Sequence, residues 1–158
     1  MNIVEVCNKK TVPDVFGQEI RGNIRETGIG GIEEVLTSEV YRFEGISSRD
    51  ELTRIAGEIL VDAVAQDYFT GDSNVERRNG YTVVDVFYRK GVTDAVSDTV
   101  VIAMRDAGIR TGVSVSTGRR YYLKGNITDG DVRTICEKVL VNPLIQEYAL
   151  VQRKGKNE

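Results

Sequence analysis

The sequence predicts an α+β fold of two tandem βαβαβ repeats that pack as a pseudo-two-fold dimer within one chain. Three observations support this prediction. Residues 3–70 match residues 83–150 without a gap, so that equivalent positions lie 80 residues apart. Each half alternates short β-branched runs with amphipathic segments, which is the pattern of strands and helices. A unit of about 70 residues is only marginally stable alone, so each half has a physical reason to bury a face against the other.

The match between the halves exceeds what chance would give. Unrelated stretches of ordinary composition coincide at about one position in sixteen. Two similar units in one chain commonly pack isologously, as the subunits of a two-fold homodimer do. Identical pairs recur along the whole alignment and include Val4/Val84, Val6/Val86, Lys10/Lys90, Asp14/Asp94, Gly28/Gly108, Val35/Val115, Tyr41/Tyr121, Ile55/Ile135, Leu60/Leu140, Gln66/Gln146 and Tyr68/Tyr148.

Each repeat begins with a predicted strand and helix. Residues 3–8 and 83–88 are β-branched and aromatic runs, which favour strands. Asp14 and Asp94 then stand where a helix N-cap belongs. A glycine followed by isoleucine indicates a left-handed residue just past the end of each helix. These glycines are Gly28 and Gly108.

A long second strand is predicted over residues 33–44 and 113–124, with a bulge or turn near Ser38 and Gly118. A second helix follows it. Its start is a capping box of Ser48 with Glu51 in the first repeat and a weaker one of Thr128 with Asp131 in the second.

The second helix carries the clearest apolar stripe of the chain, with the i, i+3, i+4, i+7, i+8 spacing of a buried helix face. Asp62 ends this helix in the first repeat and Asn142-Pro143 ends it in the second, and residues 64–69 and 144–149 then supply a third strand. The stripe consists of Leu52, Ile55, Ala56, Ile59 and Leu60, and recurs as Val132, Ile135, Cys136, Val139 and Leu140.

These elements divide the chain into four parts. Repeat one is residues 1–70, a polar linker bounded by glycines is residues 71–80, repeat two is residues 81–152, and a polar tail is residues 153–158. On one sheet face of both repeats, apolar residues alternate with charged ones such as Glu5. A face meant only for water would be more polar. We therefore expect the repeats, or a further subunit, to meet on this mixed face, with sheet-edge pairing as a second possibility.

Composition excludes several classes of function. The chain has 21 Lys and Arg against 24 Asp and Glu, a net charge of −3, so there is no general basic field for nucleic acid. No apolar run reaches the roughly 18 to 20 residues that span a bilayer, and the first ten residues lack the apolar core of a signal peptide. We expect a cytoplasmic protein that binds neither nucleic acid nor membranes.

The residue types also argue against catalysis by this chain. There is no histidine, so the commonest general base, the commonest metal ligand and the usual partner of a nucleophilic serine or cysteine are missing. Cys7 and Cys136 have the apolar equivalents Phe87 and Ala56, which favours small buried hydrophobes over redox or metal chemistry. The glycine run at residues 28–31 follows a helix, the reverse of a phosphate-binding loop. No catalytic, cofactor-binding or metal-binding residue is predicted.

Candidate interface residues come from the third strands and the linker. Gln66 and Tyr68 recur as Gln146 and Tyr148, which indicates a role between repeats or toward a partner. The alternative is that each tyrosine packs its ring on the sheet while its hydroxyl finds a local partner. The charged pairs Arg77-Arg78 and Arg119-Arg120 could hold an acidic partner, although such pairs are more often solvated surface.

The chain resembles a known family in both halves. The order of elements, the Val-x-Asp entry to the first helix, the Gly-Ile after it and the ending Leu140-Val-Asn-Pro-Leu-Ile-Gln-Glu-Tyr148 (Leu60-Val-Asp-Ala-Val-Ala-Gln-Asp-Tyr68 in the first half) are similar to the PurS-type small subunit of phosphoribosylformylglycinamidine synthase. The resemblance covers nearly the whole chain, twice. Its motifs are structural rather than catalytic.

The resemblance implies a role in purine biosynthesis. The family's enzyme makes an amidine with ATP, Mg and ammonia that a glutaminase component releases from glutamine. The small subunit is a non-catalytic dimer that bridges the synthase and glutaminase components, and single-chain enzymes carry two such units in an N-terminal domain. This chain would accordingly be a stand-alone doubled subunit or the N-terminal piece of a longer enzyme, binding no cofactor itself and with a homo-oligomer as a further possibility. The alternative function is a small-molecule-binding regulatory domain of the βαβ type.

Overall fold

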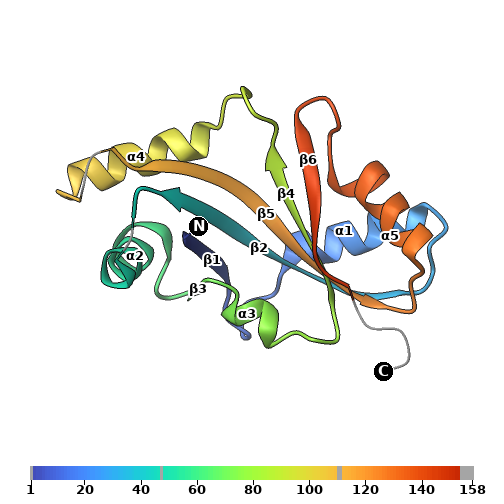
Figure 1. Cartoon of the computed structure of the whole chain (residues 1–158). Coiled ribbons are helices and arrows are strands. Elements are labelled where there is room, and N and C mark those ends of the chain that lie inside the picture. Colours follow the sequence, from blue (N-terminus) through green and yellow to red (C-terminus); the bar gives the residue numbers. More distant parts are fainter. Residues whose placement is uncertain (1, 47, 110–111, 154–158) are drawn as a thin grey trace.

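The computed structural model describes residues 2–46, 48–109 and 112–153 (Figure 1). Both repeats contain a strand, a helix, a long strand, a second helix that ends in a π-helical turn, and a third strand. Repeat one comprises β1 (Asn2–Asn8), α1 (Val15–Glu26), β2 (Ile32–Glu44), α2 (Arg49–Ile55), η1 (Ala56–Leu60) and β3 (Gln66–Thr70). After α3 (Ser73–Glu76), repeat two comprises β4 (Thr82–Tyr88), α4 (Ala95–Asp106), β5 (Ser114–Gly125), α5 (Asp129–Ile135), η2 (Cys136–Leu140) and β6 (Gln146–Gln152).

The six strands form one antiparallel sheet in the order β3-β1-β2-β5-β4-β6. The repeats join where β2 pairs with β5, so they meet edge to edge. Our first expectation, that they meet on the mixed sheet face, is wrong, and the second possibility of edge pairing is correct. Pairing two long strands satisfies their backbone hydrogen bonds, which stacking of faces would leave open.

The register of this junction places equivalent residues opposite one another. Glu39 of β2 is the direct partner of Arg119 of β5, and these two positions lie 80 residues apart. A pseudo-two-fold axis therefore passes between them. The same element order at the same spacing on both sides of this axis is what a duplication would leave.

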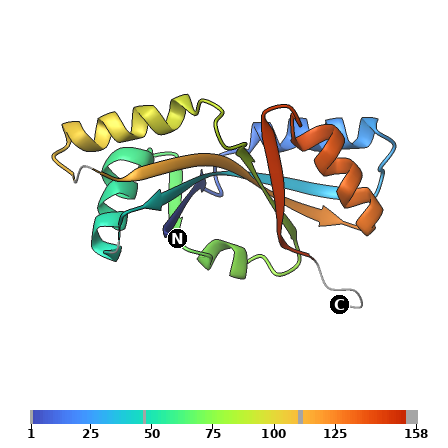
Figure 2. The same cartoon turned by 45° about the horizontal axis from the view of Figure 1, so that its top comes forward.

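The apolar core between the sheet and the four longer helices consists of two clusters, and each cluster takes residues from both repeats. Ile20 and Ile24 of α1 pack with Val132 and Ile135 of α5 over β4 and β5. In the same way, α4 packs with α2 over β1. Each first helix thus pairs with the second helix of the other repeat, and Figure 2 shows α1 beside α5 and α4 beside α2. Neither repeat contains a complete core of its own.

The linker is folded rather than irregular. Residues 73–76 form α3, whose Val75 packs on Val83 and Tyr122 on the sheet face opposite the four longer helices (Figure 2). The mixed face is therefore partly covered from within the chain. This explains its composition without a second repeat stacked upon it.

Among the other local predictions, the glycines after the helices and the capping box are confirmed, whereas the predicted bulge is wrong. Gly28 and Gly108 have φ angles of 95° and 72°, as a left-handed residue after a helix requires. The capping box of repeat two, which we predicted to be the weaker one, is complete. The Thr128 amide donates to the Asp131 carboxylate at 2.9 Å, and the Asp131 amide donates to the Thr128 hydroxyl at 3.0 Å. The bulge expected near Ser38 and Gly118 is wrong, because β2 and β5 stay in register there and shift only between Ile32 and Glu34.

Gly118 has another reason to be a glycine. A Cβ atom placed there would lie 2.5 Å from the carbonyl oxygen of Val86 and 2.7 Å from the ring of Phe87. The neighbouring strand β4 therefore leaves no room for a side chain at this position.

Candidate functional site

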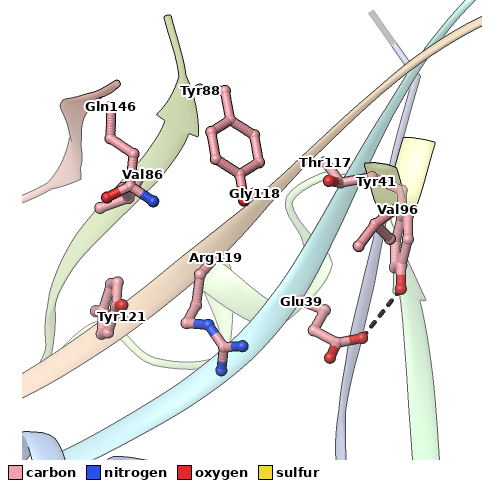
Figure 3. A pocket seen from close by; sticks show the side chains of 10 residues that line it. All are labelled: Glu39, Tyr41, Val86, Tyr88, Val96, Thr117, Gly118, Arg119, Tyr121 and Gln146. Atoms are coloured by element: carbon pink, nitrogen blue, oxygen red, sulfur yellow. Dashed lines mark hydrogen bonds between the residues drawn. The ribbon is translucent and has the colours of Figure 1, made fainter. Parts of the chain in front are cut away.

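A shallow saddle lies on the helix-bearing sheet face at the pseudo-two-fold axis. Its floor is formed by the middle of β2 and β5, between the helix pair of one core cluster and that of the other. Glu39 and Arg119 extend into it from neighbouring strands, and the Tyr41 hydroxyl donates a 3.0 Å hydrogen bond to Glu39 (Figure 3). The Arg119 guanidinium stacks 4.0 Å above the ring of Phe16.

The saddle contains two hollows that are related by the pseudo-symmetry. Their cavity volumes are about 180 and 270 Å³, below the roughly 300 Å³ at which small-molecule pockets commonly begin. Tyr41 at the rim is largely buried, and burial together with the adjacent Glu39 carboxylate raises its pKa. The saddle is suited to contact with a surface rather than to enclosure of a ligand. The linings share Glu39 and Arg119 and otherwise include Val86, Tyr88, Val96, Thr117 and Gln146 on one side and Val6, Asn8, Phe16, Thr37 and Gln66 on the other.

Asp14 and Asp94 have a structural role at the start of α1 and α4. Asp14 accepts hydrogen bonds from the Gly17 amide at 2.8 Å and from the Thr37 amide and hydroxyl at 2.6 and 2.9 Å. Asp94 makes the same contacts with Ser97 and Thr117. Each aspartate ties a helix N-terminus to the long strand of its repeat, so its carboxylate is occupied rather than poised for acid-base chemistry.

A buried charged cluster lies on the other sheet face. The Arg120 guanidinium donates to Asp85 at 2.7 and 3.0 Å and to Glu5 at 2.8 Å, and it is 1% exposed. Glu5 also accepts hydrogen bonds from Ser38, Asn74 and Tyr122, at 2.7, 2.8 and 2.5 Å. Burial alone would lower the pKa of Arg120, but the Asp85 and Glu5 carboxylates hold it above its usual value. The arginine joins Glu5 of repeat one to Asp85 of repeat two, at equivalent positions.

The two cysteines are not activated. Burial raises the pKa of the Cys7 thiol to about 11 and that of Cys136 to about 12. Both side chains therefore remain protonated near neutral pH, in accordance with the expected role as small hydrophobes for Cys136, which is fully buried, while Cys7 is half-buried.

The recurring glutamines close the turn between the second helix and the third strand. The side-chain oxygen of Gln66 accepts a 2.9 Å hydrogen bond from the Asp62 amide, and that of Gln146 accepts one from the Asn142 amide at the same distance. This local role explains why an amide recurs at these positions. Both glutamines also line the saddle.

The recurring tyrosines differ between the repeats. Tyr68 is half-buried and packs against the core cluster beneath α2. Tyr148 is 38% exposed and borders a hollow at the β6 edge. Of this pair, Tyr148 is the one available to a partner.

The linker arginines stack on rings of the same chain. The Arg77 guanidinium lies 5.1 Å from the centre of the Phe69 ring, and that of Arg78 lies 5.5 and 5.4 Å from the rings of Tyr81 and Tyr122. Arg77 is exposed and Arg78 is half-buried. Arg77 therefore retains a solvent-facing charge beside β3, whereas Arg78 helps hold the linker on the sheet.

Sequence reasoning missed the saddle and the buried charged cluster. Both could have been suspected from equivalent positions at which the repeats carry unlike residues, because Glu39 corresponds to Arg119 and Val40 corresponds to Arg120. Within the described ranges, no group of three or more Cys, Asp or Glu side chains is placed to hold a metal ion. Over the same residues, no helix is both long and apolar enough to cross a membrane.

Comparison with known families found a match for the second half of the chain. Residues 81–153 match the family model described as PurS: Phosphoribosylformylglycinamidine (FGAM) synthase. Repeat two matches the PurS family model over its whole length. The match connects the chain with FGAM synthase of purine biosynthesis, as the resemblance of the sequence implied. A search of curated proteins found no significant match to the chain.

Proposed function

We propose that this chain is a non-catalytic scaffold of FGAM synthase that bridges the ATP-dependent synthase and the glutaminase component. It would act either as a doubled small subunit or as an N-terminal domain of a longer enzyme. The observation that carries the proposal is the PurS match of residues 81–153, together with a first repeat that pairs with this domain about a pseudo-two-fold axis. Two PurS-like units in one rigid sheet would offer two similar surfaces to two different partners.

The chemistry of the described residues supports a scaffold rather than a catalyst. Asp14 and Asp94 are occupied as helix anchors, and raised pKa values keep both thiols protonated. Glu5 and Asp85 are both engaged in ion pairs with Arg120. In the complete enzyme, ATP and Mg would therefore be bound by the synthase component.

The interface residues that we propose remain those chosen from the sequence, and we rank them by the exposure of their side chains. Tyr148 and Arg77 are exposed. Gln66, Tyr68, Arg78 and Gln146 are half-buried with contacts inside the chain. We expect Tyr148 to contribute most to partner binding, because aromatic side chains that become desolvated on association dominate interfaces.

Reconstitution with purified components tests the proposal. The chain is mixed with the FGAM synthase component and the glutaminase of the same source, and the complex is measured by analytical ultracentrifugation. We expect one species that contains all three proteins, and formation of FGAM from glutamine that depends on the chain. Amidine formation by the chain alone, or full glutamine-dependent activity and assembly without it, would contradict the proposal.

The regulatory-domain alternative has one observation in its favour, the two hollows between the paired repeats. A regulatory domain of this type would gain thermal stability from its effector. A thermal-shift screen with amino acids and nucleotides separates the two functions. A scaffold is expected to show no shift with any of them.

A further inference from the structure

The two ends of the sheet are equivalent in sequence but not in exposure. β6 is seven residues long and pairs only with β4, at the end of the sheet. Tyr148, Leu150 and Val151 of β6 are 38%, 51% and 39% exposed. At the opposite end, β3 is five residues long, is mostly half-buried, and has Arg77 stacked over its Phe69. The described part of the chain therefore leaves β6 as the open edge.

Hydrogen-bond alternation identifies which backbone groups of β6 are unpaired. In an antiparallel pair, residues alternate between hydrogen-bonded and non-hydrogen-bonded positions. The Arg89 amide donates a 2.8 Å hydrogen bond to the carbonyl of Ile145, and the register is unbroken from Tyr88/Gln146 to Val84/Leu150, so Glu147 and Ala149 face β4. The amide and carbonyl groups of Tyr148 and Leu150 consequently point away from the sheet.

The side chains beside this edge suit an extended segment. Tyr148 lies opposite Val86 and Leu150 opposite Val84, so both occupy the helix-bearing face. A cavity of about 470 Å³ adjoins Tyr148, and its lining also includes Val141, Pro143 and the charged side chains of Arg89, Glu137 and Glu147. Strand addition of this kind takes affinity from main-chain hydrogen bonds and specificity from pockets for alternate side chains.

We propose that an extended segment of the synthase component adds to the sheet as a strand beside β6. One apolar side chain of this segment occupies the cavity beside Tyr148, and another packs on Leu150. The inference rests on the proposed function and deepens it, because it names the docking edge and the form of the partner.

A second copy of this chain fits the edge less well. A seven-residue strand is about 24 Å long. Two rigid twisted sheets joined only along such edges would bury less than the roughly 800 Å² per partner of a stable interface. An extended segment can follow the twist of β6, fill the cavity and belong to a partner that makes other contacts.

Leu150→Pro is the variant that isolates the edge. Proline removes one outward amide, and no hydrogen bond to β4 is lost because that amide faces away from the sheet. We expect binding to the purified synthase component to weaken about tenfold, as loss of one or two interface hydrogen bonds would cause, while the melting temperature of the chain is retained. Thr70→Pro removes the equivalent outward amide from β3 and is the matched control, with unchanged binding. Leu150→Lys replaces the proline variant if the latter does not fold.

Residue-resolved amide exchange supplies a second readout. In the free chain, the amides of Tyr148 and Leu150 should exchange faster than those of Glu147 and Ala149, and only the first two should become protected when the synthase component binds. Binding by wild-type chain without this protection, and with no loss in Leu150→Pro or Leu150→Lys, overturns the inference and leaves the proposed function standing. Absence of wild-type binding overturns both. Concentration-dependent protection of the same amides in the isolated chain assigns the edge to a second copy and overturns the inference.

Discussion

Repeat one and repeat two share their elements at a constant spacing of 80 residues but bury different residues in the centre of the sheet. Position 40 is a valine in repeat one, whereas the equivalent Arg120 in repeat two joins Glu5 to Asp85. At the axis, Glu39 stands opposite Arg119. The differences are complementary across the junction. They teach that the pseudo-dimer has become a specific pair, in which each repeat supplies a buried acid, Glu5 or Asp85, and repeat two supplies the buried base, Arg120.

The two fragments provide the strongest test of this complementarity. Residues 1–80 and residues 81–158, produced separately, are each expected to lack a stable monomeric fold, because both core clusters need helices from both repeats. Pairing repeat one with itself would oppose two Glu39 side chains, and pairing repeat two with itself would oppose two Arg119 side chains, which is destabilising in a sheet. When mixed, the fragments should form a 1:1 complex, measured by light scattering and circular dichroism. A stably folded monomer of either fragment would contradict the interlocked core.

Substitution of Arg120 is the next largest expected effect. Arg120→Val makes repeat two resemble repeat one and leaves Glu5 and Asp85 buried without their cation. Removal of one partner from a buried charge cluster costs about 3–5 kcal/mol, which urea denaturation would measure. Arg119→Val is the control, since this half-buried arginine stacks on Phe16 and, among the described residues, is not hydrogen-bonded to a buried carboxylate; it should cost less than about 1 kcal/mol. An equal decrease in the free energy of unfolding in the two variants would show that the buried charged cluster contributes no more to stability than the stacked Arg119 does.

Alanine substitution of the equivalent tyrosines in β3 and β6 tests the difference between the two edges of the sheet. Tyr148→Ala is expected to weaken assembly with the synthase component by about 1–2 kcal/mol, as loss of an aromatic anchor does, and to leave the fold intact. Tyr68→Ala should lower the stability of the chain because its ring packs against the core. Binding is measured by calorimetry and stability by thermal unfolding. If Tyr148→Ala unfolds the chain, Tyr148 is a core residue. If it is stable and assembles normally, Tyr148 is not an interface residue.

The smallest expected effect concerns Cys136, whose equivalent in repeat one is Ala56. Burial raises the pKa of this thiol from 9.0 to about 12, so the unfolded chain loses the proton first and the fold is destabilised as the pH rises between these values. Cys136→Ala should remove part of this decline and cost about 1 kcal/mol of packing at neutral pH. Unfolding titrations at pH 7 and pH 10.5 measure both effects. An unchanged pH dependence would show that another group causes the decline.

Much of the fold could be predicted from local sequence. The helix caps at Asp14 and Asp94 and the apolar stripe of the second helix follow from rules that act within one turn, and the structure contains them. The way the repeats join could not be predicted so directly. Alternation in β1 and β2 shows that both sheet faces are partly buried, but it does not identify what covers them. That depends on α3 and on the curvature of the whole sheet.

The candidate site was less accessible to sequence reasoning than the fold. Recurrence drew attention to Gln66 and Gln146, yet it cannot separate a residue that closes a turn from one that contacts a partner. The open edge at β6 has no local signal, because Tyr148 and Tyr68 are the same residue type at equivalent positions. Their surroundings differ because Tyr68 packs against the core at the β3 edge, where Arg77 of the linker also stacks over Phe69, whereas Tyr148 at the β6 edge is exposed.

Glutamine-dependent FGAM formation in the reconstituted three-component mixture tests the scaffold role most directly. The rate is measured with the synthase and glutaminase components held constant while this chain is titrated. The account predicts a rate that rises with the chain and saturates at one chain per complex, with Tyr148→Ala and Leu150→Pro requiring higher concentrations to reach the same plateau. A rate that is complete without the chain and unaffected by its addition would contradict the scaffold role.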